Sequence, residues 1–150
     1  MGAEVMVFTI SPLKVADTGR LGATHAVLSS DEQAMKGLRD KLDFILNTIS
    51  TGHDVNLYLC LLRHDGSLVI VGLPNELLAV AAYTVVCSHR SLAGSNIGGI
   101  AERQEMLDFC FKHGITAEGE AHPISLINEA PDRWDRGGLH YHLVLNVLGL

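Results

Sequence analysis

The stretch Asp65–Pro74 constrains the fold of this chain more than any other part of the sequence. It opens with the turn-forming pair Asp65-Gly66, continues as the apolar run Leu68–Val71, and stops at Gly72. A short, continuous β-branched run of this kind is typical of a buried strand in a parallel sheet with helices on both faces. Ligands of open α/β sheets bind outside the carboxyl ends of the strands. Val71 and Gly72 are therefore the first places at which we expect a cofactor.

The segments around this strand alternate between strand and helix patterns. Ser11-Pro12 is a helix start, because serine caps helices and proline is favoured at the first helical position. This alternation predicts an α/β fold with parallel strands and right-handed crossovers. The expected strands are Glu4–Thr9, Ala23–Leu28, Leu42–Leu46 and Ser91–Ser95, and the expected helices are Pro12–Leu21, Ser30 or Asp31 to Lys41, and His53–Leu62.

The second half of the chain is less regular. Glu76–Val86 is apolar but has no clear secondary-structure pattern, whereas Ala101–His113 has the pattern of an amphipathic helix that stops at Gly114. Ile124–Ala130 begins as a helix, which Pro131 is expected to break. The alternating segment His140–Val147 predicts a last strand.

Composition excludes several classes of function. A net charge of -6 and the lack of a basic stripe argue against a nucleic-acid binder. Cys60, Cys87 and Cys110 are far apart and form no C-x-x-C pair, so we expect neither disulfides nor a thiolate zinc site. The longest apolar stretch, Leu77–Cys87, is about half of the ~20 residues that a spanning helix needs. With no secretory signal pattern at the start, the sequence predicts a cytoplasmic protein that contacts neither nucleic acid nor membrane.

Six segments together carry a resemblance to a known family. The most specific is Gln-Glu-Met-Leu-Asp-Phe-Cys, followed by His-Gly-Ile. The chain resembles the zinc-dependent medium-chain alcohol dehydrogenases, in the cinnamyl-alcohol-dehydrogenase-like branch that reduces aldehydes with NADP. The resemblance runs nearly end to end, but it covers only the second half of such an enzyme. The six segments are Glu4–Ser11, Asp43–Ser50, Asp65–Pro74, Ser91–Ile100, Gln104–Ile115 and Ile127–Ala130.

This resemblance implies a partial Rossmann-like domain over residues 1–115 and a C-terminal remnant of the catalytic domain over residues 116–150. Family members carry a catalytic zinc, a second zinc on four cysteines, and a glycine-rich loop after the first Rossmann strand, all upstream of the matched part. The present sequence contains none of these, and a catalytic zinc needs three protein ligands. We therefore expect zinc in the full-length family, no metal site in this chain, and no turnover by this chain alone.

The first Rossmann strand is central in the doubly wound order, where it lies between the strands at Glu4–Thr9 and Leu42–Leu46. Without it, unpaired ladder edges are exposed, and such edges are sites of association or aggregation. The strands close up in another order, a partner fills the gap, or the chain is part of a larger assembly; the sequence leaves these alternatives open.

Three residues match the family stretch that holds the adenosine 2′-phosphate of NADP: Thr9, Ser11 and Lys14. Hydroxyls and a lysine at a helix start suit a phosphate, and no acidic residue ends this strand to bind a ribose 2′-hydroxyl. The alternative is that Ser11 only caps the helix and Lys14 is a solvated side chain. Ile10 departs from the family pattern, which usually has another hydroxyl there.

Other residues match the positions beside the nicotinamide. Thr48 matches a threonine at the nicotinamide ribose, Val71 and Gly72 match positions whose backbone lines the cofactor, and Ser95, Asn96 and Ile97 match the loop that meets the carboxamide. The alternatives are an ordinary strand-end hydroxyl at Thr48 and a tight strand-to-helix connection at Ser95–Ile97.

The histidines are expected at the surface or at helix caps. His140 and His142 share one face of a strand but have no third ligand, and His142 stands where the family often has an arginine that reaches toward the cofactor. The other histidines, which are His25, His53, His64, His89, His113 and His122, are scattered in the sequence.

Three functional hypotheses follow. The first is a partial NADP-dependent alcohol dehydrogenase that binds the dinucleotide weakly and is inactive alone. The second is a non-catalytic interaction module that pairs through an exposed sheet edge; the family's own dimer joins through the strand that matches Ser91–Gly94, so a homodimer is plausible. The third is a chain that barely folds without the central strand.

Overall fold

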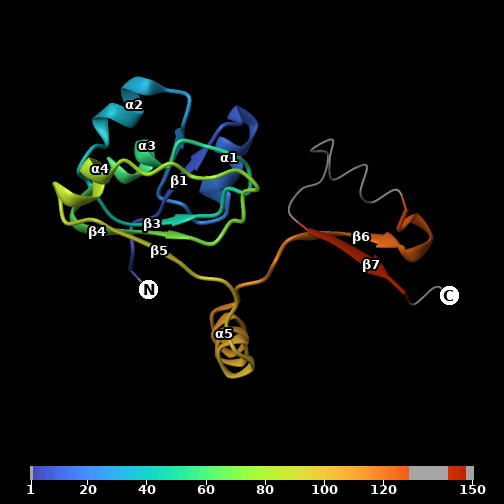
Figure 1. Cartoon of the computed structure of the whole chain (residues 1–150). Coiled ribbons are helices and arrows are strands. Elements are labelled where there is room, and N and C mark those ends of the chain that lie inside the picture. Colours follow the sequence, from blue (N-terminus) through green and yellow to red (C-terminus); the bar gives the residue numbers. More distant parts are fainter. Residues whose placement is uncertain (1, 129–141, 148–150) are drawn as a thin grey trace. The chain divides into compact units, whose positions relative to one another are not determined.

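The computed structural model describes residues 2–128 and 142–147 (Figure 1). The chain forms two compact units, Met1–Asn96 and Ile97–Leu150. The fold is mixed α/β with parallel sheets, as the sequence predicts. The boundary expected after residue 115, between a cofactor-binding part and a catalytic remnant, stays a prediction.

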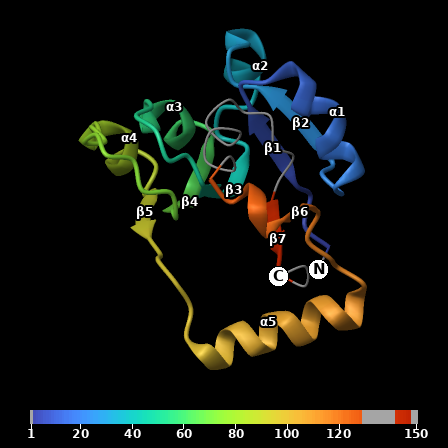
Figure 2. The same ribbon diagram turned by 90° about the vertical axis from the view of Figure 1, so that its right-hand side faces the viewer.

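The first sheet of unit 1 contains β1 (Met6–Thr9) and β2 (His25–Leu28), which lie side by side in Figure 2. They pair in parallel from Met6 opposite His25 to Thr9 opposite Leu28. The connecting helix, α1 (Pro12–Arg20), has Pro12 at its first turn as expected. Gly22 follows the helix with a φ of 95°, a left-handed conformation that glycine adopts without steric cost.

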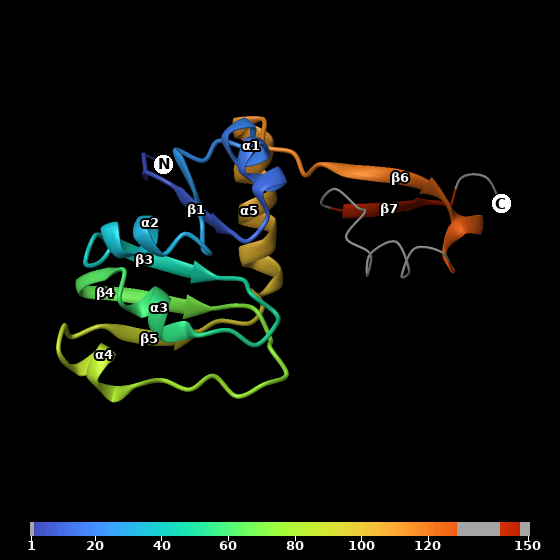
Figure 3. The same ribbon diagram turned by 90° about the horizontal axis from the view of Figure 1, so that it is seen from above.

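The second sheet of unit 1 contains three parallel strands in the order β3-β4-β5 (Figure 3). Helices α2, α3 and α4 lie on one side of this sheet (Figure 1). Asp31 and Asp54 cap α2 and α3, because their carboxylates accept hydrogen bonds from the first backbone N–H groups. The bounds are β3 (Leu42–Asn47), β4 (Leu62–Ile70), β5 (Ser91–Gly94), α2 (Glu32–Gly37), α3 (Val55–Leu59) and α4 (Ala82–Val86).

The core of unit 1 lies between this sheet and its helices. Val55 and Leu59 of α3 and Leu62 and Leu68 of β4 are fully buried. On β3, Ile45 is buried, whereas Phe44 and Leu46 on the opposite face are each 56% exposed. The expectation of a sheet covered on both faces is therefore not met within the described residues, since only the helix-covered face is filled.

The two sheets of unit 1 are separate. Strand β1 pairs only with β2 and β3 pairs only with β4 among the residues that the structure describes. The strands therefore do not close up around the position of the absent central strand. Among the described residues, β1 and β3 each have one edge that pairs with no other strand.

Three predicted boundaries are wrong. β4 begins at Leu62, so Asp65-Gly66 lies within the strand instead of forming a turn before it. Helix α2 ends at Gly37, well before Lys41, and α3 covers only Val55–Leu59 of the helix predicted over His53–Leu62. Leu62 is paired with Leu42 of β3, which places this residue in the sheet and not in the predicted helix. Residues 38–40, after α2, form a turn instead.

Unit 2 contains α5 (Ile100–His113), β6 (Gly119–Pro123), the 3₁₀ turn η1 (Ile124–Leu126) and β7 (His142–Asn146). Helix α5 ends at Gly114, which has a φ of 64°. Strands β6 and β7 pair in parallel from Gly119 opposite His142. β6 was not predicted from the sequence. The helix expected at Ile124–Ala130 begins as η1, and its predicted break at Pro131 lies outside the described residues, as do Trp134 and His140.

Within residues 2–128 and 142–147, no helix combines the length and the apolar character that crossing a membrane requires.

Candidate functional site

The carboxyl ends of β3, β4 and β5 meet at one edge of the sheet. Asn47, Ile70 and Gly94 are in register across the three strands, so the residues that follow them are neighbours. These followers are the predicted site residues Thr48, Val71 and Ser95. The Val71 N–H donates to the Asn47 carbonyl at 2.9 Å, and the Ser95 N–H donates to the Ile70 carbonyl at 3.0 Å. The structure therefore brings residues that are widely separated in the sequence to one edge.

Gly72 lies against the end of the neighbouring strand. Its N–H donates to the same Asn47 carbonyl at 3.1 Å. A Cβ at this position would lie 2.3 Å from the Ile49 carbonyl oxygen and 2.9 Å from the Thr48 carbonyl carbon. Both contacts are with backbone, which cannot turn aside as a side chain does. Close packing of two strand ends therefore requires glycine here, independently of any cofactor.

Asn47 organises this edge, although the sequence argument did not single it out. Its side chain is 4% exposed, and its Oδ1 accepts a hydrogen bond from the Ile49 N–H at 3.0 Å. Its Nδ2 lies 2.7 Å from His53 Nε2, while His53 Nδ1 lies 2.9 Å from the Thr51 carbonyl. One tautomer satisfies both contacts: Nδ1–H donates to Thr51 and Nε2 accepts from Asn47. The sequence shows only that a polar residue follows the apolar run Phe44–Leu46.

The predicted residues around this edge differ in exposure. Thr48, Ser95 and Asn96 are exposed, Val71 is half-buried and Gly72 is buried. Exposed hydroxyl and amide groups at a strand edge are available to a ligand. Ile97 is 71% exposed and belongs to unit 2, whereas this edge belongs to unit 1. Its predicted role stays a prediction.

A second group of predicted residues lies where β1 leads into α1. The Thr9 hydroxyl oxygen accepts a hydrogen bond from the Ser11 N–H at 3.1 Å, and its own proton stays available to another acceptor. Ser11 is at the N-cap position of α1, but its hydroxyl makes no capping hydrogen bond. Ser11 therefore occupies the N-cap position without a side-chain capping bond, and its role toward a phosphate stays a prediction.

The start of α1 is electrostatically suited to an anion. The positive end of the helix dipole lies here, and the first turn contains no acidic residue. Lys14 is exposed in that same turn, where a cation is unfavourable unless an anion lies nearby. Ile10, in the position that departs from the family pattern, is 83% exposed.

A cavity of about 420 Å³ lies elsewhere in unit 1. It is lined by residues from α2 and α3 and their flanks, among them Met35, Arg39 and Cys60. It contains none of the predicted cofactor residues.

The carboxyl edge of the sheet of β3, β4 and β5 is not where potential metal ligands gather among the described residues. Among the described residues, the cluster of three potential metal ligands is His64, Asp65 and His89. His64 and Asp65 lie in the amino-terminal half of β4, and His89 lies just before β5 begins. Thr48, Val71 and Ser95 follow the opposite, carboxyl ends of their strands. Within the described residues, this cluster therefore does not lie at the edge that holds the predicted cofactor residues.

Comparison with known proteins decides the family. Residues 1–112 match the family model described as zinc-binding dehydrogenase. The chain belongs to this dehydrogenase family. It is 44% identical over 150 residues to the NADP-dependent alcohol dehydrogenase C of Mycobacterium bovis, and the match covers 100% of this chain. The resemblance to zinc-dependent medium-chain alcohol dehydrogenases, inferred from the sequence, is confirmed.

Solved structures of this dehydrogenase family have the same fold. A cinnamyl alcohol dehydrogenase from Sorghum bicolor is 35% identical and superposes with a TM-score of 0.93 over 99% of this chain. A cinnamyl alcohol dehydrogenase from Helicobacter pylori, complexed with NADP(H), is 33% identical and superposes with a TM-score of 0.85.

The dehydrogenase chain described here spans less than half the length of these relatives. It covers 43% of the mycobacterial enzyme and 42% of each of the two solved chains. The matched portion is the C-terminal half, as the sequence indicates.

Proposed function

We propose that this chain carries part of the NADP(H)-binding site of a medium-chain alcohol dehydrogenase. The observation that carries the proposal is the alignment of Thr48, Val71 and Ser95 at the carboxyl edge of three parallel strands. Ligands of doubly wound folds bind at this edge. A relative with 33% identity, from Helicobacter pylori, was solved as a complex with NADP(H).

In this proposal the start of α1 binds the 2′-phosphate that distinguishes NADP from NAD. Ser11 offers an uncommitted hydroxyl, Thr9 offers a hydroxyl proton, and Lys14 offers a positive charge in the first helical turn. Strand β1 ends in Thr9 and not in a carboxylate, which would repel a phosphate and instead accept a hydrogen bond from the ribose 2′-hydroxyl of NAD. The preference for NADP therefore follows from charge.

The nicotinamide half is assigned to the second sheet. The exposed Thr48 hydroxyl is placed to bind the nicotinamide ribose, and the backbone of Val71 and Gly72 forms the wall of the site. Ser95 and Asn96 provide polar backbone groups for the carboxamide. When bound, the dinucleotide supplies or accepts the hydride; these residues hold and orient it.

We further propose that the chain alone does not interconvert an alcohol and an aldehyde. Hydride transfer in this family needs an activated oxygen on the substrate. Among the residues that the structure describes, the cluster of three potential metal ligands lies away from the carboxyl edge of the sheet. Binding without turnover is the expected behaviour, in a cytoplasmic setting. The alcohol or aldehyde substrate belongs to the whole enzyme.

A thermal melt with and without NADPH tests this proposal, with NADH as the control ligand. A ligand at about a hundredfold excess over its Kd stabilises the folded state by about 2.7 kcal/mol. For a chain of this size that corresponds to a rise in Tm of about 5–10 °C. Lys14→Gln is expected to remove most of the NADPH shift, whereas Lys112→Gln, in the last turn of α5, is expected to leave it unchanged. Equal shifts with NADPH and NADH would contradict the phosphate assignment.

A second candidate function is association through a sheet edge, and the position of β5 favours it. β5 is the last strand of its sheet and pairs on one side with β4. The Ser95 N–H turns toward β4, so the N–H of Gly94 turns to the other side, because successive peptide groups alternate along a strand. We propose that this edge, Ser91–Gly94, forms a homodimer. Light scattering of the purified chain distinguishes the dimer from a monomer.

A further inference from the structure

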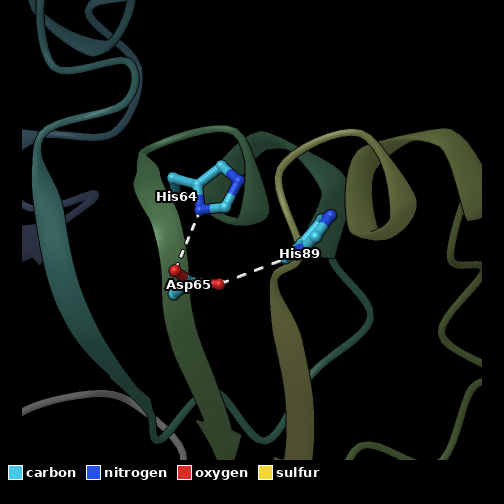
Figure 4. A group of neighbouring side chains, drawn as sticks. All are labelled: His64, Asp65 and His89. Carbon is cyan, nitrogen blue, oxygen red and sulfur yellow. Dashed lines mark ion pairs between the residues drawn. The ribbon is translucent and has the colours of Figure 1, made fainter.

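Three side chains with metal-binding atoms converge at the start of the second sheet (Figure 4). His64 and Asp65 belong to β4, and His89 lies in the connection that leads into β5. His64 Nδ1 lies 3.0 Å from one carboxylate oxygen of Asp65, and His89 Nδ1 lies 4.0 Å from the other. The ligand atoms all lie within 4.8 Å of one another. Neither the family nor the proposed cofactor site accounts for this cluster.

An irregularity in β4 presents two of these side chains. Leu42 of β3 is opposite Leu62 of β4, and the next paired residue of β3, Phe44, is opposite Ser67. β4 therefore has more residues than β3 between these two pairs. The intervening residues of β4 therefore bulge out of the ladder, and bulges re-aim side chains. Asp65 has a φ of 61°, and His89, on the facing segment, has a φ of 49°. Positive φ is uncommon in residues other than glycine.

The facing segments are held in place by hydrogen bonds from Asp65 and from the buried Arg90 side chain. The Asp65 N–H donates to the Ser88 carbonyl at 3.0 Å. Arg90, whose side chain is 6% exposed, donates from Nε to the Leu62 carbonyl and from Nη1 to the Thr84 carbonyl. Its Nη2 bonds to Asp40. The backbone on either side of the cluster is therefore preorganised, although the three side chains themselves are exposed.

The carboxylate of Asp65 is not neutralised by the neighbouring arginines, so its negative charge favours a cation. The arginines that flank the cluster in the sequence have carboxylates of their own: Arg63 pairs with Asp43 at 2.6 Å, and Arg90 pairs with Asp40. The Asp65 carboxylate faces the two imidazoles instead. Two nitrogen ligands and one carboxylate suit zinc, nickel or copper, whereas calcium and magnesium prefer oxygen ligands alone.

We propose that His64, Asp65 and His89 bind a divalent transition-metal ion of the zinc class, with water completing the coordination. Tetrahedral zinc with bonds of about 2.0–2.1 Å separates its ligand atoms by about 3.4 Å. The separation of 3.0 Å between His64 and Asp65 must lengthen slightly and the separation of 4.0 Å between His89 and Asp65 must shorten, and both changes require only rotation of side chains that are 62–75% exposed. Because the ligands are exposed and must be ordered on binding, part of the binding free energy is lost to that ordering. It lies at the opposite end of β4 from Val71 and is independent of the proposed cofactor site.

Calorimetric titration of the untagged 150-residue chain with zinc chloride tests the site. His64→Gln and His89→Asn each remove one imidazole, and asparagine tolerates the positive φ of position 89. His113→Gln is the matched control, because His113 is an exposed histidine on α5. We expect one saturable event in the wild type and in the control, and an affinity lowered by about tenfold or more in each of the other variants.

Two outcomes overturn the proposal. One is zinc affinity of His64→Gln and His89→Asn within about twofold of the wild type, and the other is an equal loss in His113→Gln. Circular dichroism verifies the fold of each variant. Where a variant does not fold, NMR of the wild-type imidazole nitrogens decides: zinc must shift the resonances of His64 and His89 first, and shifts confined to other histidines overturn the site.

Discussion

Replacing Gly72 with alanine is the most direct test of how the edge of the sheet is built. The added Cβ would lie 2.3 Å from the Ile49 carbonyl oxygen and 2.7 Å from its carbon. Both atoms are backbone, so the ends of β3 and β4 must separate to relieve the contact. That movement lengthens the hydrogen bonds from the N–H groups of Val71 and Gly72 to the Asn47 carbonyl.

The magnitude follows from these two effects. Overpacking of a close contact costs about 1–3 kcal/mol, and weakening a buried hydrogen bond adds about 0.5–1.5 kcal/mol. We expect Gly72→Ala to lower the free energy of unfolding by about 2–4 kcal/mol, or the Tm by roughly 5–15 °C. Urea denaturation followed by circular dichroism measures the first quantity, and a thermal melt measures the second.

Gly94→Ala is the matched control. Gly94 also ends a strand of the same sheet, but a Cβ there meets only the Ile70 carbonyl oxygen at 3.8 Å, an ordinary contact. Its loss of stability is expected to stay below about 1 kcal/mol. If the two variants unfold at the same urea concentration, the packing argument for Gly72 is wrong.

Two further predictions concern the same unit. Arg90→Met removes a buried guanidinium that donates to Leu62, Thr84 and Asp40, and is expected to lower the free energy of unfolding by about 2–4 kcal/mol in urea denaturation. Its control is Arg63→Met, at an ion pair whose side chains are 63% and 67% exposed, which is expected to lower it by less than about 0.5 kcal/mol. Similar urea midpoints for both variants would refute the role of Arg90. Gly94→Pro removes an N–H from the free edge of β5, while the hydrogen bond from Ser95 to Ile70 stays. Light scattering is expected to show a monomer for this variant and a dimer for the wild type. An unchanged dimer would exclude pairing through this edge.

Much of the fold is determined by local sequence. Pro12 and Gly22 bracket α1 because proline fits the first helical turn and glycine fits the left-handed residue beyond the last. Gly114 ends α5 in the same way. The apolar run before Gly72 forms a strand as predicted. These features depend on the preference of one residue or on a short sequence pattern, so they can be predicted without knowledge of the rest of the chain.

The cofactor edge was predictable because parallel strands share a direction. Once the alternation of strands and helices is recognised, the residues after each strand must lie at one edge, which groups Thr48, Val71 and Ser95. The contribution of Asn47 was not predictable, since it depends on the position of His53 and of the two N–H groups that reach its carbonyl. Their roles as cofactor ligands stay predictions.

The sequence by itself indicated the family, the alternation of strands and helices from β1 to β4, and the residues that follow the strands of the second sheet. Only the tertiary structure decided that β1 and β3 stay in separate sheets, that β4 starts before Asp65, and that β6 pairs with β7. It also brought His64 beside His89, with ring centroids 4.7 Å apart. The physical reason is that register and strand pairing are set by contacts between distant segments, whereas turns, caps and apolar runs are set by neighbouring residues.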